Sequence, residues 1–286
     1  MRRFILLFIL IVTSAFNSYS QNFGIMVGGG ATWYYGDMND RVITHEKLIR
    51  PYVNAGLLYR LSNRFDIWAS FMHGELAGDD SLAIKYAIRN RNLSFNSSID
   101  ELSLNIGYRI LGDRKGKARR VVPYIFVGIG GYHFKPKAEI GGSTVDLQSV
   151  GTEGQYIEEG DYPAPYELYQ LSVPAGLGVE FALSKAWKLR LEAGYHFLFT
   201  DYLDDVSGDY ADSASLAASP NGTVAVLLAS QIKDASYPSE GTKRGSSKVY
   251  DSFAKVGLSV LWTPFKGGSN SGQKKKKKKS HCPAYH

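Results

Sequence analysis

A twofold alternation of apolar and polar residues, repeated in eight segments, constrains this chain more than any other feature. Each segment is about ten residues long, the length of a tilted strand that crosses a bilayer. The segments are 23–35, 52–61, 65–73, 101–110, 122–134, 171–183, 187–197 and 254–262. An even number of antiparallel strands closes a barrel with both chain ends on one side. The pattern therefore predicts an all-β fold, an eight-stranded antiparallel transmembrane β-barrel of the outer-membrane type.

Charged residues indicate which face of these segments points into the barrel. The face opposite the aliphatic residues carries Arg60, Asp66, Glu101, Arg109, Glu180, Lys188, Arg190, Glu192 and Lys255. An Arg or Lys that faces lipid at the bilayer midplane costs about 2–4 kcal/mol, so this face must be the interior. An eight-stranded barrel has room only for its own side chains. We therefore predict no open pore but interior ion pairs formed by Arg60, Glu101, Arg109, Glu180, Arg190 and Glu192.

The connections between the segments give an independent indication of orientation. Long polar connections at 36–50, 77–98, 135–169 and 200–250 alternate with short ones at 62–64, 112–120 and 184–186. Outer-membrane barrels have long extracellular loops and short periplasmic turns. We therefore expect a protein of the cell outer membrane, in contact with its lipid, with both termini in the periplasm and the long loops outside.

Aromatic residues near the segment ends predict girdles at the two membrane–water interfaces. Next to the long loops they are Trp33, Tyr34, Tyr35, Tyr52, Tyr132, Phe134, Tyr169, Phe197 and Phe199. At the opposite ends they are Tyr59, Phe65, Tyr108, Tyr124, Phe181, Trp187 and Trp262. A soluble barrel with an apolar interior needs no such bands at both ends.

The first twenty residues have the pattern of a secretory signal peptide. Arg2 and Arg3 precede an unbroken apolar run over residues 4–12, which is too short to span a bilayer as a helix. We therefore expect a signal peptide at 1–20, followed by a barrel domain at 21–265.

A cationic tail is expected at 266–286. It contains Lys274, Lys275, Lys276, Lys277, Lys278 and Lys279, followed by the single cysteine of the chain, Cys282. Without the two signal-peptide arginines the formal charge of +6 becomes +4, and the six lysines leave the folded body at about −2. A nearly neutral body disfavours nucleic-acid binding, which needs a basic stripe on a folded face. The tail is either a solvated charge run or a tether for an acidic periplasmic partner or lipid phosphates, with Cys282 available for an intermolecular disulfide.

Catalysis fits the sequence poorly. His196 lies on the inward face, four residues after Glu192 and close to Asp201, and a His–carboxylate pair suits a lipid hydrolase or protease. No motif marks a nucleophile beside it, so we favour a hydrogen-bonded structural histidine. We predict no catalytic residues, no cofactor and no small-molecule substrate.

An acidic run opens the last long connection. It consists of Asp201, Asp204, Asp205, Asp209 and Asp212. Carboxylates on a flexible loop are suitable calcium ligands, although this spacing is not that of a known calcium loop. A solvated acidic loop is the simpler interpretation, and both hypotheses stay open at this point.

Four stretches of the chain share a pattern with a known family. They are Tyr34–Asp37, Leu171–Phe181, Thr200–Gly208 and the lysine-rich end that finishes at Cys282–Tyr285. In them the chain resembles the PorG-type outer-membrane barrels of the type IX secretion system. The resemblance implies an outer-membrane subunit that docks the periplasmic ring built by the system's lipoprotein and its partner protein. It also implies that the tail lysines and Cys282 make the contact.

The sequence therefore predicts a non-enzymatic barrel that anchors or scaffolds a secretion complex. Two alternatives from other classes stay open. One is a small barrel that binds surface ligands through its extracellular loops, and the other is a lipid-modifying outer-membrane enzyme that uses rim residues such as His196.

Overall fold

The computed structural model describes residues 22–40, 44–112, 119–232 and 236–263. The expected signal peptide and the cationic tail with Cys282 lie outside these residues. No helix within the described ranges is long and apolar enough to cross a membrane.

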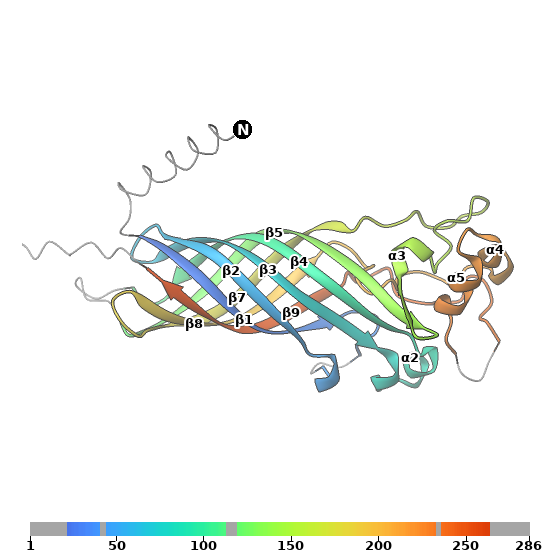
Figure 1. The fold of residues 1–286 in the computed structure, drawn as a ribbon, viewed down its shortest axis with the longest axis horizontal. Helices are drawn as coiled ribbons and strands as arrows, with labels where there is room; N and C mark the ends of the chain where they lie inside the picture. Colours follow the sequence, from blue (N-terminus) through green and yellow to red (C-terminus); the bar gives the residue numbers. More distant parts are fainter. Residues whose placement is uncertain (1–21, 41–43, 113–118, 233–235, 264–286) are drawn as a thin grey trace, which may run out of the picture.

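The described chain contains nine strands and six short helices (Figure 1). They are β1 (Phe23–Tyr35), η1 (Glu46–Leu48), β2 (Arg50–Arg60), β3 (Phe65–Asp79), η2 (Asp80–Leu82), α2 (Tyr86–Arg91), β4 (Ser94–Arg109), β5 (Val121–Ile140), β6 (Ser143–Asp146), α3 (Leu147–Val150), β7 (Tyr169–Ala182), β8 (Trp187–Leu198), α4 (Ser213–Ala218), α5 (Gly222–Ala229) and β9 (Ser252–Trp262). Each of the eight expected strands is present.

Eight of these strands form a closed antiparallel barrel, which confirms the expected fold class. Neighbouring strands pair in sequence order, and β1 pairs with β9 from Ile25↔Trp262 to Tyr35↔Ser252 to close the cylinder. The short strand β6 pairs only with the end of β5, so it prolongs a hairpin above the barrel. Closure leaves no strand edge within the barrel wall, as a sheet in hydrocarbon requires.

The alternation of side chains places the apolar face outside. On β4, Leu102, Leu104 and Ile106 are exposed, whereas Ser103 and Asn105 between them are buried. A protein in water would have the opposite arrangement, and hydrocarbon around the barrel accounts for it. The wall is therefore that of a transmembrane barrel.

Three strands, β3, β4 and β5, run at least six residues further than the sequence pattern indicates. The ladder of β3 and β4 continues to Asp79↔Ser94, so the prediction of loop from 77 to 98 is wrong at both ends. Likewise β5 continues to Ile140 instead of ending at 134. In this added part of β4 the apolar residues point inward instead of outward, since Phe95 and Ile99 are buried. This part of the wall stands above the apolar band.

The long connections fold into one body at the end of the barrel where β1 ends and β9 begins (Figure 1). We call this body the cap, and it consists of the described residues of loops 36–49, 80–93, 141–168 and 199–251. Its apolar core includes Leu147, Val150, Leu203, Val206, Leu216 and Leu228. The connections that the sequence pattern describes as long and polar therefore contain an apolar core of their own. The opposite end carries the short connections, and we call it the turn end.

Part of the aromatic prediction is also wrong. Tyr34, Tyr52, Tyr124, Tyr132 and Phe134 are buried inside the barrel and the cap. They occupy strand positions whose side chains point inward, and a side chain keeps this direction even near the end of a strand. Exposed aromatic residues do lie at the turn end, where Trp187 and Trp262 stack with ring centroids 5.9 Å apart.

The depth of the apolar band is testable with paired substitutions. Leu104 lies in the middle of β4 between Ala69 and Ile129, and Leu61 follows the end of β2. We expect Leu104→Arg to lower the free energy of unfolding by about 2–4 kcal/mol and Leu61→Arg by about 0–1 kcal/mol. Denaturant unfolding from lipid vesicles measures both, and equal costs would contradict the assigned depth.

Candidate functional site

Glu180 is the centre of an ion-pair network inside the turn end. Lys188 Nζ lies 3.1 Å from Glu180 Oε1, and Arg60 Nη2 lies 3.3 Å from Glu180 Oε2. Arg109 Nη2 approaches the same carboxylate at 3.7 Å. Asp66 is a second anion, which accepts a hydrogen bond from Arg60 Nε at 2.9 Å. Three cations and two carboxylates thus fill the barrel at this level.

Arg190 fills the barrel at mid-height. Its guanidinium carbon lies 4.5 Å from the ring centroids of both Trp68 and Tyr124. Nε donates a hydrogen bond to the Tyr124 hydroxyl at 3.0 Å, and Nη2 lies 3.5 Å from Glu192 Oε1. A desolvated cation–π contact contributes about 2 kcal/mol or more, which helps to offset burial of the charge.

Glu101 holds a histidine and a serine towards the cap. Its Oε1 lies 2.9 Å from His196 Nδ1 and accepts a hydrogen bond from the Ser172 hydroxyl at 2.5 Å. All three residues are buried, and the Phe253 ring stacks on the imidazole at 4.2 Å. These residue types occur in nucleophilic catalysis, but there the hydroxyl must contact the imidazole. Here the hydroxyl donates to the carboxylate instead.

The structure brings the six residues expected in interior ion pairs into three groups. They are Arg60, Arg109 and Glu180 at the turn end, Arg190 with Glu192 at mid-height, and Glu101 with His196 towards the cap. The sequence places His196 nearest to Glu192 and Asp201, but Glu101 reaches it across the interior from β4. No local spacing in the sequence indicates this contact.

The first three residues of the acidic run after β8 do not belong to a solvated loop. Asp201, Asp204 and Asp205 are buried, and this part of the prediction is wrong. Asp204 Oδ2 lies 2.5 Å from the Tyr34 hydroxyl, and Asp251 Oδ1 lies 3.0 Å from the same oxygen. A hydroxyl has one hydrogen, so it can donate to only one of the two carboxyl groups. The second contact therefore needs a proton on a carboxyl group.

Two buried arginines link the loops of the cap. Arg244 Nη1 lies 2.9 Å from Glu153 Oε1, and its Nη2 lies 3.7 Å from Asp205 Oδ2. Arg91 donates to both oxygens of Asp80 at 2.7 and 2.8 Å, and to the backbone carbonyl of Arg244. A further bond from Arg91 reaches the carbonyl oxygen of residue 37 at 3.0 Å, so all four loops are connected.

The cap residues were missed by the sequence analysis. Tyr34 belongs to β1, Arg91 and Glu153 lie in two different loops, and a third loop contains both Arg244 and Asp251. No motif relates their positions. The two outer members of the acidic run have local roles instead. They are Asp209, which pairs with Lys243 at 2.7 Å, and Asp212, which caps α4 through Ser215.

The acidic run does not assemble into a cation site. Within the described ranges, no group of three or more His, Cys, Asp or Glu side chains could hold a metal ion. The hydroxyl groups of Thr152 and Tyr166 donate to Asp205 at 2.5 and 2.8 Å. Its oxygens are therefore already engaged with protein donors.

Burial dominates the titration of the cap carboxyl groups. It raises the pKa of Asp201 to about 7 and the pKa of Asp205 to about 6. Burial, assisted by the nearby Asp204 and Asp201 carboxylates, raises the pKa of Asp251 well above its usual range. The pKa of Asp204 is raised in the same way, with Asp37 as the nearby charge. The pair around Tyr34 therefore retains a proton near neutral pH.

Comparison with known proteins identifies one family and several solved barrels. The family described as "Domain of unknown function (DUF6089)" matches residues 1–219. No curated protein matches the chain. The similar solved structures include Neisserial surface protein A, with 9% identity over 84% of this chain and 96% of that chain at a TM-score of 0.40. Ail of Yersinia pestis, in complex with the heparin analogue sucrose octasulfate, has 11% identity over 85% of this chain and 98% of that chain, with a TM-score of 0.38. The outer membrane protease OmpT from Escherichia coli has 9% identity over 85% of this chain and 97% of that chain, with a TM-score of 0.35.

Removal of the central anion tests the interior network. We expect Glu180→Gln to lower the free energy of unfolding by about 3–5 kcal/mol, because it leaves buried cations without their shared carboxylate. Denaturant unfolding of the reconstituted barrel measures this loss. Glu75→Gln is the matched control, since Glu75 is exposed on β3 and its replacement should change stability by less than about 0.5 kcal/mol. A loss of similar size in both variants would contradict the network.

The protonated carboxyl pair predicts a pH dependence of the cap. A carboxyl group whose pKa is raised by folding contributes stability that is complete below its unfolded pKa of about 4. That stability falls as the pH rises through the folded pKa. Cleavage within loop 199–251 by a broad-specificity protease should therefore accelerate between pH 5 and pH 8.

An amide in place of one acid should reduce this dependence. Asp251→Asn retains an oxygen for the Leu203 N–H, which Asp251 Oδ2 accepts at 2.9 Å, and supplies an N–H donor to the Tyr34 hydroxyl. We expect Asp251→Asn to slow cleavage at pH 8 several-fold relative to the parent chain and to make the pH profile shallower, while Asp201 and Asp205 retain part of the dependence. Asp209→Asn, which alters an exposed ion pair, should leave the profile unchanged. An unaltered slope in Asp251→Asn would exclude the shared proton.

Proposed function

We propose that this chain, which belongs to the DUF6089 family, is a non-enzymatic outer-membrane subunit that anchors the periplasmic ring of a type IX secretion machine. The cationic tail makes the contact with the ring. The folded cap faces the cell exterior.

The single observation that carries the proposal is the position of the two strand ends. Ile25, near the start of β1, pairs with Trp262 at the end of β9, so both ends lie at the turn end. The cap lies at the opposite end (Figure 1). Residues 264–286 follow in sequence from the turn end, which faces the periplasm if the longer loops are extracellular. The six lysines and Cys282 then lie on the side where a periplasmic ring assembles.

The filled interior supports anchoring over transport through the barrel. The Glu180 network occupies the turn end, Arg190 occupies mid-height, and the cap core covers the other end. A narrow barrel filled with paired charges provides a stable attachment to the membrane. Passage of a protein substrate would require a separate channel.

A catalytic function has less support. The Ser172 hydroxyl donates to Glu101 and not to the imidazole of His196, and all three side chains are buried. His196 therefore has the geometry of a structural group that orders the interior between β4, β7 and β8.

One observation favours ligand binding by the cap as a second candidate function. A hollow of ≈ 330 Å³ lies between loops 80–93 and 199–251. Its lining includes the polar side chains of Asn90, Arg91, Thr242, Lys243 and Ser246. A small polar ligand of the cell exterior is the class that such a hollow fits.

Tail variants test the anchoring function. We expect a chain that lacks residues 274–286 to insert normally, to lose co-purification with ring proteins, and to reduce secretion at least tenfold. Replacement of the six lysines by glutamine keeps the tail length and removes the charge, whereas Cys282→Ser removes only the thiol. Mass spectrometry after gentle extraction without reductant identifies which replacement releases the ring.

Two further variants separate the alternatives. Lys243→Ala alters the cap hollow and His196→Ala alters the interior, and both should retain secretion. Normal secretion by the tail-deleted chain would contradict the anchoring function. Loss of function in Lys243→Ala alone would favour ligand binding, and loss in His196→Ala alone would favour an enzyme.

A further inference from the structure

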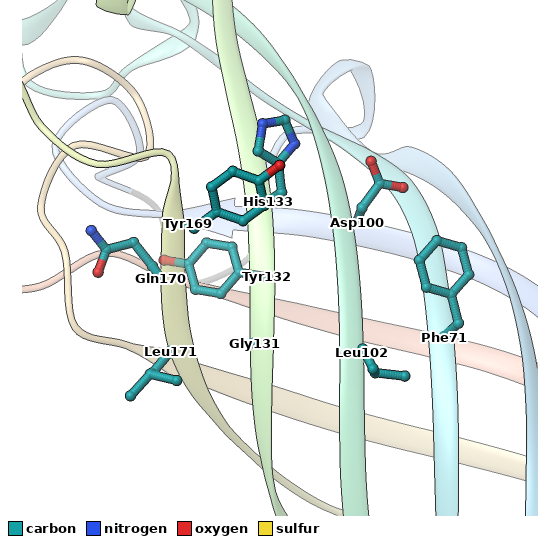
Figure 2. Close-up of a pocket in the computed structure, with 9 residues that line it drawn as sticks. All are labelled: Phe71, Asp100, Leu102, Gly131, Tyr132, His133, Tyr169, Gln170 and Leu171. Atoms are coloured by element: carbon teal, nitrogen blue, oxygen red, sulfur yellow. The ribbon is translucent and has the colours of Figure 1, made fainter.

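A groove in the outer wall of the barrel lies over Gly131, a glycine that barrel packing does not explain. Among the glycines of the described strands, Gly131 is the one at which an added Cβ would meet no atom within 4 Å. At Gly257, by contrast, a Cβ would collide with the Tyr52 hydroxyl. The register places the exposed side chains of Leu102 and Leu171 directly beside Gly131. The missing side chain between them opens a groove of ≈ 590 Å³, which we call the wall groove (Figure 2).

Two successive outward rows of side chains line the wall groove. The lower row is Phe71, Leu102, Gly131 and Leu171, and the upper row is Asp100, His133 and Tyr169. His73 pairs with Asp100 beside the groove and does not line it. The change from apolar to polar side chains therefore falls inside the groove. This change marks the boundary between the hydrocarbon and the headgroup layer on this side of the barrel. An amphiphilic molecule of the bilayer can contact both rows at once.

The polar row offers a mixed set of hydrogen-bonding groups. Asp100 Oδ1 lies 2.7 Å from His73 Nδ1, and the Asp100 side chain remains 39% exposed. The rings of His133 and Tyr169 lie side by side above Gly131, with centroids 4.7 Å apart (Figure 2). A carboxylate acceptor, an imidazole and a phenol hydroxyl together suit a headgroup with several hydroxyl groups.

Two lysines lie above the polar row. Lys135 and Lys137 follow His133 on the outward face of β5. Their Nζ atoms lie 2.7 and 3.7 Å from Asp146, and each lysine side chain is 40% exposed. Two ammonium groups share the one Asp146 carboxylate here, so N–H donors on them stay available for a phosphate group. Lys135 lies two residues beyond His133, about 7 Å along the strand, which favours a large headgroup.

We propose that the wall groove binds one phosphorylated glycolipid of the leaflet on the cap side. An acyl chain of the lipid lies over Gly131 between Leu102 and Leu171. Sugar hydroxyl groups bind Asp100 and His133, and a phosphate binds Lys135. This site is independent of the anchoring function, since none of its residues belongs to the tail.

Native mass spectrometry of the full chain tests this proposal directly. The probe is a bisphosphorylated, acylated glucosamine disaccharide, titrated in competition with phosphatidylglycerol. We expect Gly131→Leu to weaken retention of the probe at least tenfold, because the new side chain fills the groove. Ala193→Leu is the control, since it adds a similar side chain to the outward face of β8, between Leu177 and Val256.

A second variant keeps the proposal testable if Gly131→Leu fails to fold. The doubly substituted chain His133→Ala, Lys135→Ala leaves the wall intact and removes polar contacts, and it should also lose the probe. The heat-dependent shift of the folded barrel in gels verifies folding of each variant. Equal retention by parent and Gly131→Leu would overturn the proposal. Preference for phosphatidylglycerol would overturn the assignment of a glycolipid and indicate a phospholipid site.

Discussion

The backbone hydrogen bonds between β1 and β9 are the interaction on which the rest of this structure depends. Hydrocarbon supplies no water to satisfy N–H and C=O groups, so a sheet in a membrane must join its first strand to its last. With eight strands, this closure produces a cylinder that admits side chains and little else. The charges that the outer face cannot carry must then share the interior, where each needs a counter-charge. The network around Glu180 and the position of Arg190 between two aromatic rings both follow from that restriction.

Alternation along the strands was sufficient to predict the membrane-spanning part of the fold. It failed for the ends of β3, β4 and β5, and the reason lies in the surroundings of the chain. Within the bilayer the apolar residues face outward, but above it the wall has water outside and an apolar cap core inside. The inward positions therefore change from polar to apolar residues, as at Phe95 and Ile99. A search for outward apolar residues then ends the strand too early. Sequence alone does not mark the level at which the surroundings change.

The sequence predicts which charged residues lie in the interior, but only some of the contacts that they make. The alternation along the strands predicts that Arg60, Arg109 and Glu180 share the interior, because a charged side chain on the lipid face costs too much free energy. Which carboxylate meets His196 does not follow, since Glu101 reaches it from across the barrel. The acidic run was mistaken for a solvated loop because its partners, Tyr34 and Arg244, come from remote segments. Burial of a carboxyl group depends on such partners, and a local pattern does not contain them.

The position of the Tyr34 hydroxyl has a consequence for the order of folding. Tyr34 lies at the end of the first strand, while Asp251 precedes the last strand and Asp204 follows the strand before it. These contacts span 217 and 170 residues of chain, among the longest separations that the protein allows. Loop-closure entropy opposes such contacts until the intervening strands have paired. We therefore expect the cap to reach its native packing only after the barrel has closed. Completion of the cap would then be a late step of folding that depends on correct pairing of β1 with β9.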